Sequence, residues 1–169
     1  VVLYYLGRLD SAQFVLEVAA EKHPHQSEIN HFLGLVHLGK NDPAEAQLYL
    51  TIASEKDSVS GDIWFHLGQA YKHLKQLKEA RASLENAVGI DSTHAEALYA
   101  LGQIYTKLDQ KEKSQKVLKQ FKVVSDFEKT EKKLTKQLSL NPSNNNCPLY
   151  KSYVADEGLS IDRGANQTI

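Results

Sequence analysis

The seven histidines and the single cysteine are the residues of this sequence that could hold a metal. The histidines closest to one another form three pairs: His23 and His25, His31 and His37, and His66 and His73. Two histidines four residues apart on one helix, with a carboxylate nearby, would present ligands on one face, and none of these pairs has that spacing. With Cys147 alone, neither a disulfide framework nor a cysteine-based zinc site is expected.

Residues for catalysis do not occur in a recognisable arrangement either. The sequence has no glycine-rich phosphate loop, no nucleophile elbow and no pair of acidic residues in a defined pocket. Its Ser, His and Asp residues lie in repeated columns or on the polar faces of expected helices. We therefore expect no enzymatic activity, no cofactor and no metal.

The composition indicates a soluble all-α protein. Of 169 residues, 41% are apolar and 24% charged, while glycine and proline number only nine and four. The apolar stretch at residues 1–6 is too short to span a bilayer. Because the chain begins at Val1 and contains no Met, we expect a fragment or a processed form, and we favour a cytoplasmic location.

The lysines gather towards the end of the chain. Ten lysines and five acidic residues lie between positions 107 and 136, a net charge of +5 in a chain of net charge −1. Such a segment could meet nucleic acid or an anionic membrane. Its lysines nevertheless interleave with apolar residues such as Val117 and Phe121, and it has no Arg and no aromatic platform for bases. We therefore expect a solvated outer helix face, with no nucleic-acid partner and no membrane insertion.

One pattern recurs along the chain at an offset of 34 residues and is clearest between Trp64 and Asp91. Its columns are Leu33-Gly34, Leu67-Gly68 and Leu101-Gly102; Ala12, Ala46 and Ala80; and Leu16, Leu50, Leu84 and Leu118. Within each unit the apolar residues have helical spacing. The chain is therefore expected to be a tandem array of helix pairs.

The offset divides the chain into segments. These are a partial first unit at 1–26, full units at 27–60, 61–94 and 95–128, a capping helix or an extension of the last helix at 129–141, and a flexible tail at 142–169. Pro43 suits the first turn of a second helix, with Asp42 as its cap. Phe121 stands where earlier units have alanine, which indicates the end of the stack.

Two arrangements remain open after Phe121. Either the last helix runs on to about Leu138, or Asp126 caps a separate terminal helix. Beyond Ser143 the periodicity is lost, which predicts a flexible tail. The glycosylation sequon at Asn166 is expected to be a chance match.

Trp64, Leu67, Gly68 and Tyr71, followed by Ala80 and Leu84, resemble the tetratricopeptide repeat (TPR). The resemblance covers about residues 1–128 and departs from the family where Ser58 and Ser92 replace proline. It implies a right-handed α-solenoid of antiparallel helix pairs, a TPR superhelix. The recurring glycines are expected to let paired helices approach closely, with Ala46 and Ala80 meeting them from the partner helix.

The resemblance also implies that the first helix of each pair lines a concave groove. Carried over residue by residue, this groove consists of Tyr4, Tyr5, His31, Leu35, Leu38, Phe65, Gln69, Lys72, Tyr99, Gln103 and Thr106. Phe65 and Tyr99 would be apolar anchors, and Gln69 and Gln103 would bond to a partner backbone. The alternative is that the aromatic residues pack against neighbouring helices.

These features predict a protein–protein interaction scaffold that binds an extended peptide or a helix of a partner protein. The lysines, asparagines and arginine with which some relatives grip a chaperone carboxylate are replaced here, for example by His31 and Phe65, so a chaperone-tail receptor is not expected. Two alternatives stay open. The chain could be the docking region of a larger enzyme or secretion component, or an assembly unit that self-associates into a homo-oligomer through an open N-terminal face at Val1, Val2 and Leu6.

Overall fold

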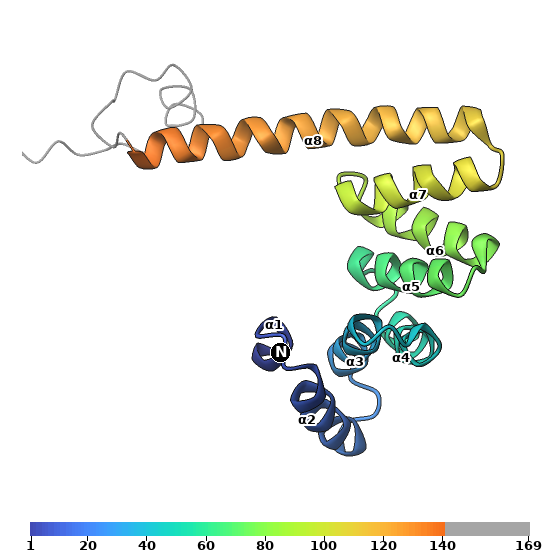
Figure 1. Ribbon diagram of the computed structural model, residues 1–169, viewed down its shortest axis with the longest axis vertical. Helices are drawn as coiled ribbons and strands as arrows, with labels where there is room; N and C mark the ends of the chain where they lie inside the picture. Colours follow the sequence, from blue (N-terminus) through green and yellow to red (C-terminus); the bar gives the residue numbers. More distant parts are fainter. Residues whose placement is uncertain (141–169) are drawn as a thin grey trace, which may run out of the picture. The chain divides into compact units, whose positions relative to one another are not determined.

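The computed structural model describes residues 1–140, with side chains placed as far as Gln137. These residues form eight α-helices and no strand (Figure 1). In order they are α1 (Val2–Tyr5), α2 (Leu9–Lys22), α3 (Ser27–Gly39), α4 (Pro43–Lys56), α5 (Gly61–His73), α6 (Leu77–Ile90), α7 (Ala95–Lys107) and α8 (Lys111–Leu140). The expected tail at 142–169, with Cys147 and the sequon at Asn166, lies outside the described residues.

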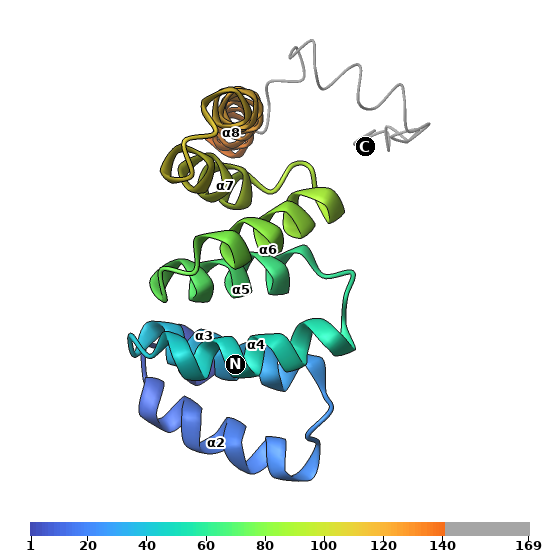
Figure 2. The same ribbon diagram turned by 90° about the vertical axis from the view of Figure 1, so that its right-hand side faces the viewer.

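The helices of residues 1–126, a first compact unit, pack in sequence order. Helix α3 packs on α4 and α5 on α6, and successive pairs meet through the contacts of α4 with α5 and of α6 with α7 (Figure 2). This arrangement confirms the predicted all-α solenoid of helix pairs. A second unit begins at Phe127. Because α8 is a single helix from Lys111 to Leu140, the chain has the extended last helix rather than a separate helix capped by Asp126.

In the three full repeats, a glycine of the first helix lies against a leucine from the second helix of the same pair. A Cβ atom added to Gly68 would lie 2.7 Å from Leu84 Cγ, and one added to Gly102 would lie 2.5 Å from Leu118 Cδ2. Gly34 has the same relation to Leu50. The expected alanine also lies close at Gly68, where Ala80 O is 3.4 Å from the added Cβ, but the leucine side chain is nearer and fills the space that the missing Cβ leaves.

Larger side chains fill the space between successive pairs. Trp64 and Tyr71 of α5 pack against a cluster that includes Ala46 and Leu50 of α4. Tyr71 also packs against the next cluster, which contains Leu84. One tyrosine therefore contributes to two layers of the stack, as the expected packing role of this column requires.

The turn between the helices of a pair contains one residue in the left-handed region. Asn41, Lys75 and Asp109 have φ values of 60°, 61° and 56°, and Gly7 in the same column has 70°. The amide of each following residue bonds back to the helix, as in the 2.8 Å bond from Asp42 N to His37 O. Gly7, Asn41 and Asp109 are residue types that favour this conformation, whereas Lys75 is not. The column therefore has no single residue type by which the sequence would show it.

Asp42 precedes α4, and Pro43 occupies the first turn as expected, but the Asp42 side chain makes no cap hydrogen bond. Its carboxylate instead lies 3.5 Å from Nδ1 of His37. His37 is 7% exposed and its ring stacks on Tyr49 at 5.4 Å, which agrees with its expected packing role. The Asp42 carboxylate, which was predicted to cap α4, therefore lies beside His37 instead.

Two histidines join neighbouring repeats. His31 Nε2 of α3 and His66 Nδ1 of α5 are 3.0 Å apart, so one ring donates a hydrogen bond to the other. Burial lowers the pKa of both rings, and with the repulsion from His31 it brings the pKa of His66 to about 4. The carboxylate of Asp62 acts in the opposite direction on both. Both rings are therefore neutral at pH 7.

We expect Gly68→Ala to lower the free energy of unfolding by roughly 1–3 kcal/mol, because the new methyl group meets the fully buried Leu84. Gly68→Leu should cost more. Gly89→Ala on α6 is the matched control: no atom lies within 4 Å of its added Cβ. That change should be neutral or stabilise by up to about 1 kcal/mol. Urea denaturation measures the free energy of unfolding of each variant. Equal effects of alanine at Gly68 and at Gly89 would contradict the close contact of Gly68 with Leu84.

Acidification is expected to destabilise the array through His31 and His66. In the unfolded chain both pKa values return to about 6.5. The unfolded state then binds more protons between pH 6.5 and 4, so the free energy of unfolding falls as the pH drops through this window. The loss from His66 amounts to up to about 3 kcal/mol. Denaturation curves at pH 7, 5.5 and 4.5 measure it.

The double variant His31→Gln/His66→Gln is the control for this pH dependence, because glutamine stays neutral throughout the range. Its stability should fall less steeply between pH 6.5 and 4 than that of the wild type. A slope unchanged by the substitutions would show that other groups cause the acid sensitivity.

Candidate functional site

We call the eleven residues predicted to line the groove the first-helix surface. They lie on α1 (Tyr4, Tyr5), α3 (His31, Leu35, Leu38), α5 (Phe65, Gln69, Lys72) and α7 (Tyr99, Gln103, Thr106). Helix α3 contacts α5, and α5 contacts α7. Residues from three successive repeats are thus carried by neighbouring helices.

The two tyrosines of α1 form an aromatic group with Phe32 of α3. The rings of Tyr4 and Tyr5 lie edge to face at 5.4 Å, and they lie 6.1 and 6.4 Å from that of Phe32. Tyr5 is 74% exposed, whereas Tyr4 is partly buried against the cluster of α2 and α3. Tyr5 is therefore the more accessible of the two.

The α3 residues are less available than expected. Leu35 is 9% exposed, and Leu38 packs against the cluster containing Leu50 and Leu67. His31 is held by the bond to His66 described above. Helix α3 therefore presents mainly packing residues, because its neighbours α4 and α5 cover its apolar side.

Phe65 belongs partly to the core and partly to a cluster with histidines. It packs against the cluster that contains Leu84 and Leu101. Its ring centroid lies 5.0 Å from that of His66 and 4.8 Å from that of His94. His94, which precedes α7, has Nε2 3.2 Å from Asp62 Oδ1. Sequence reasoning gave these two histidines no part in the site, because the repeat columns do not predict which rings meet across repeats.

Tyr99 is the most exposed apolar residue that α7 contributes. It is 48% exposed, and its ring lies 5.2 Å from the ring of Phe121 on α8. Phe121 stands where the earlier repeats have alanine, so this contact occurs only in the last repeat. The ring of Phe121 therefore packs beside Tyr99, one of the two predicted apolar anchors.

A polar row continues beyond the aromatic residues. Lys72 Nζ donates a 3.0 Å hydrogen bond to Gln103 Oε1, which joins α5 to α7. Burial and the nearby charge of Lys107 lower the pKa of Lys72. Thr106 Oγ1 donates to the carbonyl of Gly102 at 3.0 Å, and Gln69 is partly buried. The structure therefore brings Lys72 and Gln103 together as one polar element.

A tyrosine on the packing side of α7 is also hydrogen-bonded. Tyr105 Oη donates to Glu85 Oε1 at 2.7 Å. Burial and this carboxylate raise the pKa of Tyr105 to about 12. The phenol is therefore protonated at neutral pH and acts as a fixed donor between α7 and α6.

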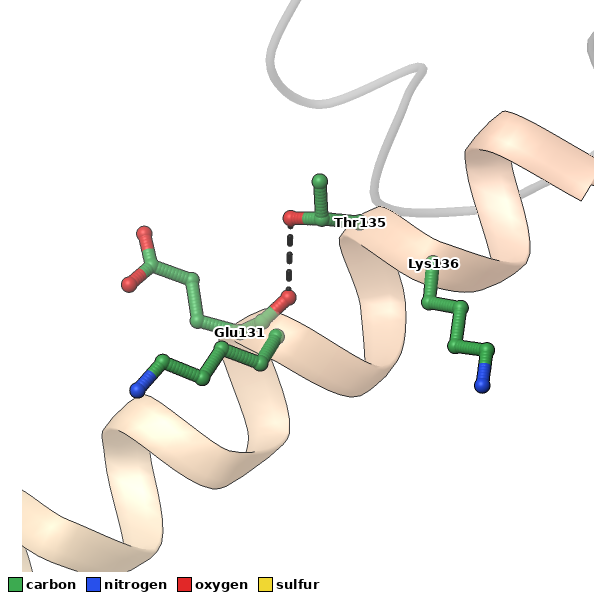
Figure 3. A pocket seen from close by; sticks show the side chains of 4 residues that line it. Glu131, Thr135 and Lys136 are labelled. Atoms are coloured by element: carbon green, nitrogen blue, oxygen red, sulfur yellow. Dashed lines mark hydrogen bonds between the residues drawn. The ribbon is translucent and has the colours of Figure 1, made fainter. Parts of the chain in front are cut away.

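Neither a group of metal ligands nor the pocket on α8 adds residues of the described chain to the first-helix surface. Within residues 1–137 no three His, Cys, Asp or Glu side chains are grouped as metal ligands. The pocket in Figure 3 is lined by Glu131, Lys132, Thr135 and Lys136 of α8 alone, all of them exposed. In it Thr135 Oγ1 donates to the carbonyl of Glu131 at 2.9 Å, a bond within one helix. None of the helices in the described part is both long and apolar enough to cross a membrane.

Comparison with known proteins gives consistent results. Two tetratricopeptide repeat families match the sequence, one at residues 33–95 and one at 73–121, which together span more than half of the chain. A MamA crystal structure has a TM-score of 0.70 and 17% identity, with 95% of this chain and 92% of that chain covered. Another has a TM-score of 0.69 and 20% identity, with 72% and 71% covered.

A third similar structure contains a peptide. It is the second TPR of Spaghetti (RPAP3) bound to the HSP90 peptide SRMEEVD, with a TM-score of 0.58 and 15% identity over 63% of this chain and 98% of that one. At these identities the three likenesses concern the fold. None of the curated proteins compared with the sequence matches it significantly.

The recurring columns at an offset of 34 residues, the stacked helix pairs and both family matches lead to the same result. The chain belongs to the tetratricopeptide repeat family.

Proposed function

We propose that this protein is a non-catalytic interaction scaffold that binds an extended peptide or a helix of a partner protein on the first-helix surface. The observation that carries the proposal is that α5 and α7 use different residues for packing and for this surface. Leu67, Gly68, Leu101 and Gly102 are buried in the stack. Tyr99 and its polar neighbours on the same helices stay accessible.

The accessible residues offer the chemistry that a peptide requires. Tyr99, 48% exposed, and the partly exposed Phe65 supply apolar area, and aromatic side chains often dominate binding energy. Gln69 and Gln103 carry amide groups that can both donate to and accept from a peptide backbone. A row of apolar and amide side chains on neighbouring helices suits an extended segment or an amphipathic helix.

Relatives support this proposal at the level of the fold. The TPR domain of Spaghetti holds a peptide of HSP90, so this helical arrangement can bind a short segment of another protein. The positions at which some relatives grip a chaperone carboxylate are occupied here by residues such as His31, Leu35 and Phe65. A partner of different sequence is therefore expected.

The double variant Phe65→Ala/Tyr99→Ala is expected to lose partner binding at least tenfold, because it removes both apolar anchors. Capture of partners from an extract, followed by quantitative mass spectrometry, measures the loss. Phe127→Ala is the matched control, since Phe127 is an aromatic residue of α8 that is 68% exposed and lies outside the first-helix surface.

Circular dichroism separates binding from folding in this experiment, because Phe65 also packs against the core. Tyr99→Ala alone, which removes a half-exposed ring, provides the test if the double variant loses helicity. Partners retained in full by folded Tyr99→Ala and Phe65→Ala/Tyr99→Ala proteins would rule out this surface.

A second candidate function is self-association through the first two helices. Val2 and Leu6 are 71% and 66% exposed, and Phe14 is 69% exposed. Exposed apolar side chains of this kind are common at protein interfaces. This surface uses other residues than the first-helix surface, so the two functions can be separated.

Light scattering at increasing protein concentration tests the self-association. If it occurs, the mass should rise above that of the monomer, and Val2→Asp/Leu6→Asp should restore the monomer by placing charges in the apolar contact. A constant monomer mass over the whole range would exclude this candidate.

A further inference from the structure

We propose that the partner of the first-helix surface is acidic at one position, and that Lys72 and Lys107 hold a carboxylate of the partner between them. This inference rests on the proposed function, and it adds the chemistry of the partner. The two lysines lie in the last turns of α5 and α7, the neighbouring helices that carry Phe65 and Tyr99.

The geometry of Lys72 is the first support. Its ammonium group is partly buried and donates to Gln103 Oε1, one turn before Lys107 on α7. Gln103 is neutral, so it orients Lys72 without balancing its charge. Among residues 1–137 no carboxylate lies within ion-pairing distance of Lys72 or Lys107. The surface thus contains two neighbouring cations with no anion of its own.

The first repeat offers an internal comparison. Lys40, which follows α3, lies 2.7 Å from Asp10 Oδ1 and also donates to Gln13 Oε1 at 2.9 Å. There an acidic residue of the preceding helix α2 balances the lysine after the first helix. Lys72 and Lys107 lie near the same end of their first helices as Lys40 but in other columns of the repeat, and Asp109 after α7 pairs with Lys111. Because no acid of the described residues pairs with Lys72 or Lys107, a carboxylate from outside the chain can take that place.

Placement at helix ends alone does not explain these lysines. A cation in the last turn interacts favourably with the helix dipole, but it does so equally well when fully exposed. Lys72 is instead partly buried near Lys107, where burial and repulsion both disfavour its charge. A bound carboxylate would relieve that repulsion and form charge-assisted hydrogen bonds.

The opposite ends of the same helices carry the opposite charge. Glu28, Asp62 and Glu96 lie in the first turns of α3, α5 and α7. An acidic group would be repelled there and attracted to the lysine end. The charge distribution therefore favours an acidic partner, and it places the partner carboxylate at the C-terminal ends of α5 and α7.

Selection from a displayed library of random peptides tests the inference. Peptides selected by the wild-type protein should be enriched in Asp and Glu relative to the starting library. Peptides selected by Lys72→Gln/Lys107→Gln should show no such enrichment. Lys116→Gln/Lys119→Gln is the matched control, because it removes the same charge from exposed positions of α8 and should leave the enrichment unchanged.

One selected acidic peptide and its Glu→Gln counterpart then complete a double-mutant cycle by fluorescence anisotropy. The wild-type protein should bind the acidic peptide at least tenfold more tightly than the Gln peptide, with a difference that shrinks at high salt. The Lys72→Gln/Lys107→Gln protein should bind both peptides equally. Its unfolding midpoint should fall only slightly, because the change removes the single hydrogen bond from Lys72 to Gln103 and neither lysine has an ion pair within residues 1–137.

The outcomes separate this inference from the proposed function. Selected peptides that require Phe65 and Tyr99 but contain no excess of acidic residues would overturn the acidic partner and leave the scaffold intact. An equal loss of affinity in the Lys116→Gln/Lys119→Gln control would also overturn it, since the effect would be one of net charge. A library that yields no binder would overturn both proposals.

Discussion

The close contact of a glycine with a leucine inside the helix pair of each full repeat is the constraint on which the structure depends. Leu50 and Leu84 are fully buried against Gly34 and Gly68, at roughly 1.5–3 kcal/mol of burial for each leucine. Because a Cβ atom at the glycine would overlap the leucine, the helices of a pair reach their observed separation only with glycine there. The separation of the two helices in each full repeat, and so the position of α3, α5 and α7 on their partner helices, follows from this contact.

Contacts between repeats are of a more varied kind. Tyr71 packs in two layers, His31 bonds to His66, and Lys72 bonds to Gln103. The last two pairs join first helices directly and involve groups whose pKa values are lowered by burial. The repeats are thus joined by apolar contacts, whose strength does not depend on pH, and by hydrogen bonds of titratable side chains, whose strength does. Since neighbouring repeats stabilise one another, a change at one polar contact affects the adjacent layers as well.

The first-helix surface combines support from the core with accessible chemistry. Phe65 contacts the core and the rings of His66 and His94. Tyr99 packs beside Phe121 and remains half exposed. Side chains held in this way lose little further freedom when a partner binds, which favours affinity. The polar row from Gln103 to Lys107 adds charge at one end of the same helices. The proposed scaffold function and the acidic partner both follow from this placement.

The sequence by itself determined the architecture of helix pairs, because apolar and small residues that recur every 34 positions leave few other ways to bury them. Only the tertiary structure decided the individual contacts: that a leucine side chain fills the space at Gly34, Gly68 and Gly102, that Asp42 lies beside His37, and that Leu35 is buried. It also decided that Lys72 bonds to Gln103, one turn before Lys107, and that no carboxylate of residues 1–137 forms an ion pair with either lysine. Such contacts join residues as near in the sequence as His37 and Asp42 and as far apart as Lys72 and Gln103. They depend on rotamers and on the helix separation, which a one-dimensional pattern does not contain.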